Sequence, residues 1–499
     1  MIRGVAACRV NAGSPALAAQ GSKKPSMAEN DITRGVALAR TRSGGGLRST
    51  PLPRHVRRAL SMPAAERAEA GRQTLLVTTA PPLLRPVGAL LLSVVLLMLG
   101  NGPLTTLISL RLNAAGASPT LTGLVATAYF LGLTLGALQA FRVILRVGHI
   151  RAFAVFASTV SATGLVYALW QNAALWALVR LVDGFCMAGL FICIESWLND
   201  RAEPARRGAL LAAYMVCVYG AQAAGQGLLN IGGAGDLRPF LLLSILMGLS
   251  VLPISMTSKS PTALPDVASL SLRQLYRISP LGMVGTVTSG LLLGAVYALA
   301  PLFARGSGLD LAGTTLFMTA LILGGMALQW PLGRLSDRFD RRLVILGTLA
   351  ALTASSILVL LAAPHGTAWL LTTGALFGGL VFALYPLCVS HTNDWLGAGD
   401  RVAASGGLVL AYSFGAAAGP VLASTGMSLV GRSGLFLYAG LVSLACLGFG
   451  LWRLTARATL PAEQQHPYQG LPGTTPAVAP LHPMAEGENE AEKEATGAG

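Results

Sequence analysis

Of the 499 residues, 53% are hydrophobic and only 11% are charged, whereas charged residues make up about a quarter of a soluble domain. This balance excludes a soluble globular protein and requires most of the chain to lie in lipid. The formal net charge of +15 would suit a nucleic-acid binder, but it is spread over the first 85 residues and many short links, so nucleic acid is not an expected partner.

Two terminal segments differ in composition from the rest of the chain. Residues 1–85 are rich in Arg, Ala, Gly, Ser and Pro with few aromatic residues, and we predict that they are a disordered basic segment. Their composition also resembles a transit peptide, and a true start at Met27 or Met62 is an open alternative. Residues 458–499 collect Pro, Glu and Gly without periodicity, which predicts a second disordered tail.

Between these segments, apolar runs of about 20 residues, long enough to cross a bilayer as helices, alternate with short polar links. Lipid offers no partner to unpaired backbone groups, and the runs lack the alternation of a membrane barrel. We therefore predict an all-α membrane protein with twelve transmembrane helices. The predicted spans are 86–110, 120–141, 152–172, 174–198, 208–231, 238–257, 280–303, 311–332, 343–363, 367–392, 402–427 and 433–455.

The longest internal link, residues 258–279, divides the spans into two sets of six. We expect one bundle at 86–257 and the other at 280–457, joined by a cytoplasmic linker. Arg and Lys are concentrated in the links after even-numbered spans, and such loops face the cytoplasm. The prediction is a multi-pass protein of the cell inner membrane with both termini cytoplasmic.

An internal repeat supports this division. The sequence TAYFLG from Thr127 recurs as TALILG from Thr319, and LFICIESWLND from Leu190 recurs as LYPLCVSHTND from Leu384, in both cases about 190 residues later. A repeat of six spans in the same orientation indicates two pseudo-symmetric parallel bundles with a cavity between them.

The most specific motif is GRLSDRFDRR, residues 333–342, after the eighth span. It resembles the loop signature of the major facilitator superfamily, in which a glycine, an acid and arginines connect helix ends and lock one face of the protein. The resemblance implies a cytoplasmic gate formed by Gly333, Asp337, Arg338 and Arg341. A basic loop that only sets topology is the alternative.

This motif departs from the family pattern in both halves. Asp340 replaces the family's late glycine, which puts the usual turn in doubt. The equivalent loop of the first half, FRVILRVGHIR at 141–151, has Leu145 where the acid belongs. Any latch in the first half would need Asp200 or Glu195 instead.

Charged residues also occur inside the fourth span, where Arg180, Asp183 and Gly184 resemble the family's span-four pattern. A lone charge near the midplane costs several kcal/mol, and an i,i+3 spacing places both charges on one helix face. They form either a mutually neutralising structural pair or a proton or substrate site, with Asp183 as the protonatable partner because arginine stays charged. Glu195 is a third candidate for proton coupling, or else a gate salt bridge.

Polar residues of the first and fifth spans are candidates for solute binding. Tyr219, Gln222 and Gln226 form a stripe at i, i+3 and i+7 that would line a cavity. The sequence GNGP at 100–103 is predicted to interrupt the first span and present Asn101 to a solute. Weaker candidates are Tyr129, Tyr297 and Tyr385.

The phrases GALLAAYMVCVYG, LQWPLGRLSDRF and FALYPL are similar to the YcaD-like bacterial permeases of the same superfamily. This resemblance implies a rocker-switch secondary transporter of a small organic solute, coupled to protons. Proton antiport and efflux are favoured, with import, or a sensor that does not transport, as alternatives. No nucleophile with a base and no ligand cluster falls together, so we expect no enzyme activity, no metal, no cofactor, and a monomer in the lipid bilayer.

Overall fold

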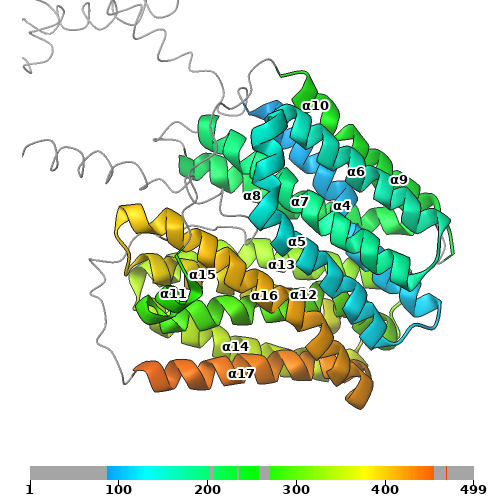
Figure 1. The fold of residues 1–499 in the computed structure, drawn as a ribbon. Coiled ribbons are helices and arrows are strands. Elements are labelled where there is room, and N and C mark those ends of the chain that lie inside the picture. Colours follow the sequence, from blue (N-terminus) through cyan, green and yellow to red (C-terminus); the bar gives the residue numbers. More distant parts are fainter. Residues whose placement is uncertain (1–86, 202–206, 233–234, 258–269, 455–467, 469–499) are drawn as a thin grey trace, which may run out of the picture. The chain divides into compact units, whose positions relative to one another are not determined.

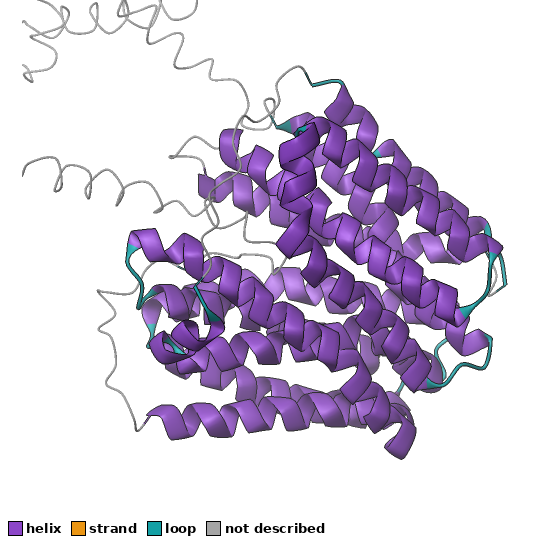
Figure 2. Cartoon of the chain, viewed as in Figure 1, coloured by secondary structure: helices purple, strands orange, loops and turns teal. Residues whose placement is uncertain are grey.

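The computed structural model describes residues 87–201, 207–232, 235–257, 270–454 and 468. Over these residues the secondary structure consists of helices and short connections, without a strand (Figure 2). The predicted basic segment 1–85 lies outside the described residues, as does the predicted tail 458–499 apart from Tyr468.

Twelve membrane-crossing helices form two bundles of six (Figure 1). Eleven stretches of the described chain are long and apolar enough to span a bilayer, and the last of them, 403–454, contains two helices. The first bundle comprises α4 (Gly88–Ala114), α5 (Pro119–Val147), α6 (His149–Leu169), α7 (Ala173–Arg201), α8 (Arg207–Gln226) extended by the 3-10 turn η2 (Gly227–Ile231), and α9 (Arg238–Leu249) continued by α10 (Val251–Ser255).

The second bundle has the same arrangement. It comprises α12 (Pro280–Gly306), α13 (Leu311–Arg338), α14 (Arg341–Ala362), α15 (Thr367–Asn393), α16 (Ala398–Val430) and α17 (Gly434–Leu454), with 3-10 turns η3 (Ala363–His365) and η4 (Gly431–Ser433). A short helix, α11 (Leu272–Ile278), precedes α12.

Local sequence signals set the helix ends. The Ser118 hydroxyl accepts a hydrogen bond from the Leu121 N–H (3.2 Å) at the start of α5, and the Asp310 carboxylate accepts one from the Gly313 N–H (2.7 Å) at the start of α13. Gly148 separates α5 from α6 with a φ of +86°, a left-handed conformation that favours glycine. A single residue is thus enough to reverse the chain.

Two details of the predicted spans are wrong. The GNGP sequence does not interrupt the first span, because α4 is continuous with Pro103 inside it. Gly100 and Gly102 instead allow close packing: a Cβ at Gly100 would meet Met247, and one at Gly102 would meet Gln222. The residues from Gly333 to Arg338 also belong to α13 and not to a loop, because the eighth span continues as helix beyond its apolar part.

Glycines bring pairs of helices together at equivalent places in the two bundles. A Cβ at Gly184 of α7 would collide with the Tyr129 carbonyl of α5, and one at Gly378 of α15 would collide with the Leu321 carbonyl of α13. Backbone contact of this kind is how helices associate in lipid, where the hydrophobic effect offers no attraction between them.

We predict that Gly378→Ala lowers the stability of the folded protein by about 1–3 kcal/mol, because the added methyl group meets backbone that cannot rotate away. The measurement is the melting temperature of the detergent-solubilised chain. Gly347→Ala is the matched control, since a Cβ there meets nothing within 4 Å. Equal melting temperatures for the two variants would contradict the assignment of Gly378 to a tight helix crossing.

Candidate functional site

Within the described residues, most hydrogen bonds between the two bundles lie toward one end of the protein. We call the end that carries Arg146, Arg151, Arg334 and Arg338 the basic end, and the other the opposite end. At the opposite end, neutral hydrogen bonds connect the halves. They are Thr120 Oγ1 with Ser428 Oγ (3.0 Å), Thr127 Oγ1 to the Ala417 carbonyl (2.8 Å), Ser109 Oγ to the Ala298 carbonyl (2.8 Å) and Asn230 Nδ2 to Thr315 Oγ1 (3.0 Å).

A central cavity of about 130 Å³ lies between the halves, and helices of both bundles line it. Of the described residues, none that lines it is charged. Its polar lining consists of tyrosines and neutral hydrogen-bonding side chains: Asn101, Thr105, Tyr129, Tyr219, Gln222, Tyr297, Tyr385 and Tyr412. Such a surface can stack on a ring and exchange hydrogen bonds with it.

The structure brings three of the four predicted solute-binding residues to this cavity. Asn101, Tyr219 and Gln222 line it, and the Asn101 Oδ1 atom is buried without a hydrogen-bond partner. Gln226 does not line the cavity: it is 1% exposed, and its Nε2 atom lies 3.5 Å from the Gly102 carbonyl. One turn farther along α8, the helix packs against α4, so the i+7 member of the stripe is buried between helices.

Aromatic rings form part of the wall of the central cavity. The Tyr219 and Phe382 rings meet edge to face at 5.4 Å, and the Tyr297 and Phe382 rings do so at 5.8 Å. The Tyr297 hydroxyl donates a hydrogen bond to Gln222 Oε1 (3.1 Å). The sequence did not predict that Phe382 belongs to this wall, because its apolar surroundings in the tenth span do not distinguish it from a core residue.

A second, larger cavity of about 480 Å³ lies on the basic-end side of Tyr219. Helices α8 and α13, one from each half, line it, and Tyr219 belongs to the walls of both cavities. Its polar lining differs from that of the central cavity because it includes charges, Arg334 and Asp337. The two cavities therefore follow one another from the basic end to the middle of the protein.

Arg180 and Asp183 form a buried network beside the central cavity. The guanidinium lies 4.1 Å from the centre of the Tyr129 ring, and its Nη2 atom donates to Thr105 Oγ1 (2.7 Å). On the other side, Nη1 is 3.7 Å from Asp183 Oδ2, so Arg180 lies between the acid and the cavity wall.

Asp183 itself is directed toward α6 and not toward the central cavity. Its carboxylate accepts hydrogen bonds from the Tyr167 hydroxyl (2.6 Å) and from the Thr163 hydroxyl. It is 0% exposed, so this set of donors replaces water completely. The sequence offered no sign of Thr163 and Tyr167, because both are isolated polar residues of an apolar span.

Glu195 lies on the same helix, about 18 Å from Asp183 at the 1.5 Å rise of an α-helix. It is fully buried, and it accepts a hydrogen bond from the Tyr214 hydroxyl of α8 (3.2 Å). The structure therefore places Glu195 apart from the Arg180 network, with its side chain bonded to α8 through Tyr214.

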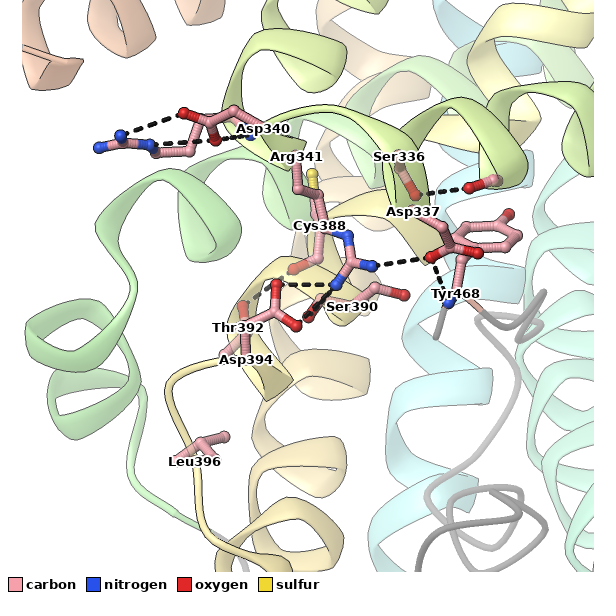
Figure 3. A network of polar contacts seen from close by, with 12 residues as sticks. Ser336, Asp337, Asp340, Arg341, Cys388, Ser390, Thr392, Asp394, Leu396 and Tyr468 are labelled. Atoms are coloured by element: carbon pink, nitrogen blue, oxygen red, sulfur yellow. Dashed lines mark hydrogen bonds and ion pairs between the residues drawn. The ribbon is translucent and has the colours of Figure 1, made fainter. Parts of the chain in front are cut away.

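The gate motif forms a charged network within the second bundle (Figure 3). Arg341 is 1% exposed, and its Nη1 atom lies 2.7 Å from Asp394 Oδ1, while Nη2 lies 3.1 Å from Asp337 Oδ1. Nη1 also lies 3.2 Å from the Ser390 carbonyl. Asp394 is therefore a member of the network that the sequence did not assign to the gate.

The other predicted gate residues have different surroundings. Gly333 faces the ring of Tyr468, whose backbone N–H donates to Asp337 Oδ1 (2.7 Å) (Figure 3). Burial raises the pKa of the Tyr468 phenol, so this group is neutral. Arg338 is exposed and pairs with no acid among the described residues.

Asp340, which replaces the family's glycine, acts as the N-cap of α14. Its Oδ1 accepts a hydrogen bond from the Arg342 N–H (3.0 Å), and its Oδ2 lies 3.2 Å from Arg342 Nη2. The carboxylate thus starts the new helix and pairs with the arginine that follows.

Comparisons with known proteins agree with this architecture. The sequence profile of the Major Facilitator Superfamily matches residues 90–330 and 282–482. The uncharacterized MFS-type transporters YcaD of Salmonella enteritidis and Salmonella typhimurium are each 31% identical over 379 residues, which is 73% of this chain and 94% of theirs. The chain belongs to the major facilitator superfamily. It is a secondary transporter by family and not an enzyme.

Solved structures show the same superfamily fold at low sequence identity. The nucleoside transporter NupG aligns with a TM-score of 0.64 at 13% identity, over 74% of this chain and 98% of NupG. A bacterial homolog of the human lysosomal transporter Spinster, solved in an inward-facing and occupied conformation, aligns with a TM-score of 0.61 at 15% identity, over 78% of this chain and 99% of the other.

We predict that Asp394→Asn costs about 3 kcal/mol of stability, because it leaves the buried Arg341 with a much weaker partner. Arg338→Gln, in the same motif but exposed, should change stability by less than about 0.5 kcal/mol. Melting temperatures in one detergent compare the two variants. If Asp394→Asn melted no lower than Arg338→Gln, the contact between Arg341 and Asp394 would not stabilise the fold.

Proposed function

We propose that this transporter moves a small, uncharged or weakly charged organic solute that contains a ring, by rocker-switch alternating access. The observation that carries the proposal is the uncharged central cavity between the halves, with five tyrosines, Asn101 and Gln222 in its lining. A highly charged solute such as a phosphate ester would need several arginines for binding.

We assign direct solute contacts to Asn101, Tyr219 and Gln222. The unpartnered Asn101 Oδ1 atom is available to accept a hydrogen bond from a solute hydroxyl or amine. Gln226, buried against α4, supports the shape of the site without touching the solute. A nucleoside, the substrate class in the name of NupG, has the ring and hydroxyl groups that such a lining would bind.

Coupling to protons is the second part of the proposal. Asp183 is the proton carrier and Arg180 links it to the cavity, because Arg180 contacts both Asp183 and the cavity-lining Tyr129 and Thr105. Protonation of Asp183 would remove its attraction for the guanidinium, freeing Arg180 to move against the cavity wall. Glu195, which contacts α8 through Tyr214, is a second proton site that would respond to movement of α8.

For direction and topology, we propose export by proton antiport across the cell inner membrane, with the basic end and both termini in the cytoplasm. Under this topology the 480 Å³ cavity opens toward the cytoplasm and the hydrogen bonds of the opposite end close the periplasmic side. The central cavity, lined by aromatic rings and neutral hydrogen-bonding groups, suits a neutral ring-containing solute that the cell exports.

The solute is to be found by comparing the metabolites and drug susceptibility of strains that lack or overproduce the chain. Purified protein in liposomes then tests each candidate under an imposed proton gradient. We expect a solute to move against its gradient when protons flow the other way. Import under the same gradient would reverse the proposed direction, and tight binding without movement under any gradient would favour a sensor.

We predict that Gln222→Ala reduces transport of that solute at least 10-fold, because it removes a polar contact of the cavity and the acceptor of the Tyr297 hydroxyl. The matched control is Gln139→Ala, an exposed glutamine in α5 of the same bundle. Initial rates in liposomes measure the effect. If both variants transported at the wild-type rate, the central cavity would not be the binding site.

We also predict that Asp183→Asn uncouples transport from the proton gradient while exchange of labelled for unlabelled solute continues. The amide keeps the shape of the carboxyl group but cannot gain or lose a proton. Exchange and gradient-driven transport are measured on the same liposomes. A variant that keeps full gradient-driven accumulation would exclude Asp183 as the proton carrier.

A further inference from the structure

A small pocket lies at the basic end of the second bundle, away from the two cavities between the halves. It is formed where α12 begins and where α14, α15 and α17 meet near their basic-end termini. We call it the α12 pocket, and its polar lining consists of Ser279, Arg342, His391, Trp395 and Arg453.

The first turn of α12 has backbone N–H groups without an acceptor in the helix. Helix α12 is 27 residues long and begins at Pro280. The Met283 N–H is bonded to the Ser279 carbonyl (2.9 Å), which leaves the N–H groups of Leu281 and Gly282 at the first turn without a helical acceptor. Free N–H groups and the helix dipole together favour an anion at this position.

Ser279 offers a second, independent donor at this place. It is 1% exposed, lines the α12 pocket, and its hydroxyl has no hydrogen-bond partner among the described residues. It precedes the helix but does not cap it, because its side chain makes no hydrogen bond to the first turn. A buried hydroxyl left without a partner costs about 1–3 kcal/mol, so a hydrogen bond to a ligand would be favourable here.

The charges around the pocket have the sign that an anion requires. Arg342 is 8% exposed and pairs with Asp340 at 3.2 Å. Arg453 is half-buried and lies over the Trp452 ring at 5.7 Å. The α12 pocket is thus lined by two arginines, one from α14 and one from α17, and by no acid among the described residues.

The surroundings of the pocket are those of a lipid–water boundary. Trp452 is 62% exposed beside Arg453, and Leu451 and Leu343 are also exposed, at 52% and 56%. Exposed tryptophans beside arginines mark the membrane interface. A ligand held here thus has its charged part in the α12 pocket and an apolar surface of α14 and α17 beside it.

We propose that the α12 pocket binds the phosphate of an anionic phospholipid, whose acyl chains lie along the exposed surface of α14 and α17. The pocket volume of about 30 Å³ has room for one phosphate oxygen rather than the whole ester. That oxygen accepts hydrogen bonds from the Ser279 hydroxyl and the first turn of α12, while Arg342 and Arg453 neutralise the phosphate at the mouth. This site is independent of the solute and of proton coupling.

The test is native mass spectrometry of the full chain, titrated with phosphatidylglycerol, phosphatidylcholine or inorganic phosphate in the same detergent. We expect phosphatidylglycerol to bind at least ~10-fold more tightly than phosphatidylcholine. Arg453→Gln should lower the affinity for phosphatidylglycerol about 10-fold. Ser279→Ala should weaken binding about 3-fold, since it removes a single neutral donor.

Arg151→Gln is the matched control, because Arg151 is exposed at the basic end of the other bundle. A melting temperature of each variant confirms folding. If Arg453→Gln and Arg151→Gln lowered the affinity for phosphatidylglycerol equally, the proposal would be overturned, because general surface charge would explain the binding. Inorganic phosphate that displaced the lipid at equal concentration would overturn the lipid assignment and leave a site for a soluble anion.

Discussion

Lipid offers no hydrogen-bond partner, and this constraint accounts for the arrangement of the polar residues in the two bundles. Arg180 is tolerated in the fourth span because Thr105, Tyr129 and Asp183 surround it with an acceptor, a ring face and an opposite charge. Asp183 in turn takes two hydroxyl donors from α6. The pair near the middle of the membrane thereby connects α7 to three other helices, α4, α5 and α6, so a change in the protonation of Asp183 would alter contacts among all four.

The two halves resemble each other more in their helix-packing contacts than in their charged residues. Glycine-mediated contacts bring α5 to α7 and α13 to α15 at equivalent positions. The charged network of the gate motif, in contrast, belongs to the second bundle. There Arg341 joins Asp337 to Asp394. In the first bundle Leu145 replaces the acid and is 66% exposed. The two halves therefore share the packing positions, where a side chain would collide with backbone, and differ at the position of the acid in the gate motif.

The sequence predicted the number of membrane spans and the two-bundle fold because apolar run length and an internal repeat can be read directly from the chain. It failed at positions where the outcome depends on a neighbouring helix. Gly100 and Pro103 looked like a helix break, but α8 and α9 pack against the same residues and keep α4 continuous. Tyr412 and Phe382 line the central cavity although nothing in their own spans distinguishes them from core residues. Gln226 shared the spacing of a cavity-lining stripe, yet packing removes it from the cavity.

The contacts between the halves are weak enough for the two bundles to move relative to each other. The hydrogen bonds across the opposite end are all between neutral groups, and each contributes about 1 kcal/mol net. The stronger charged contacts, Arg341 with Asp394 and Arg180 with Asp183, lie within one bundle or the other and can persist when the bundles rotate. Breaking these four hydrogen bonds thus costs a few kcal/mol, which is within the range that differential binding of a solute in the central cavity can supply.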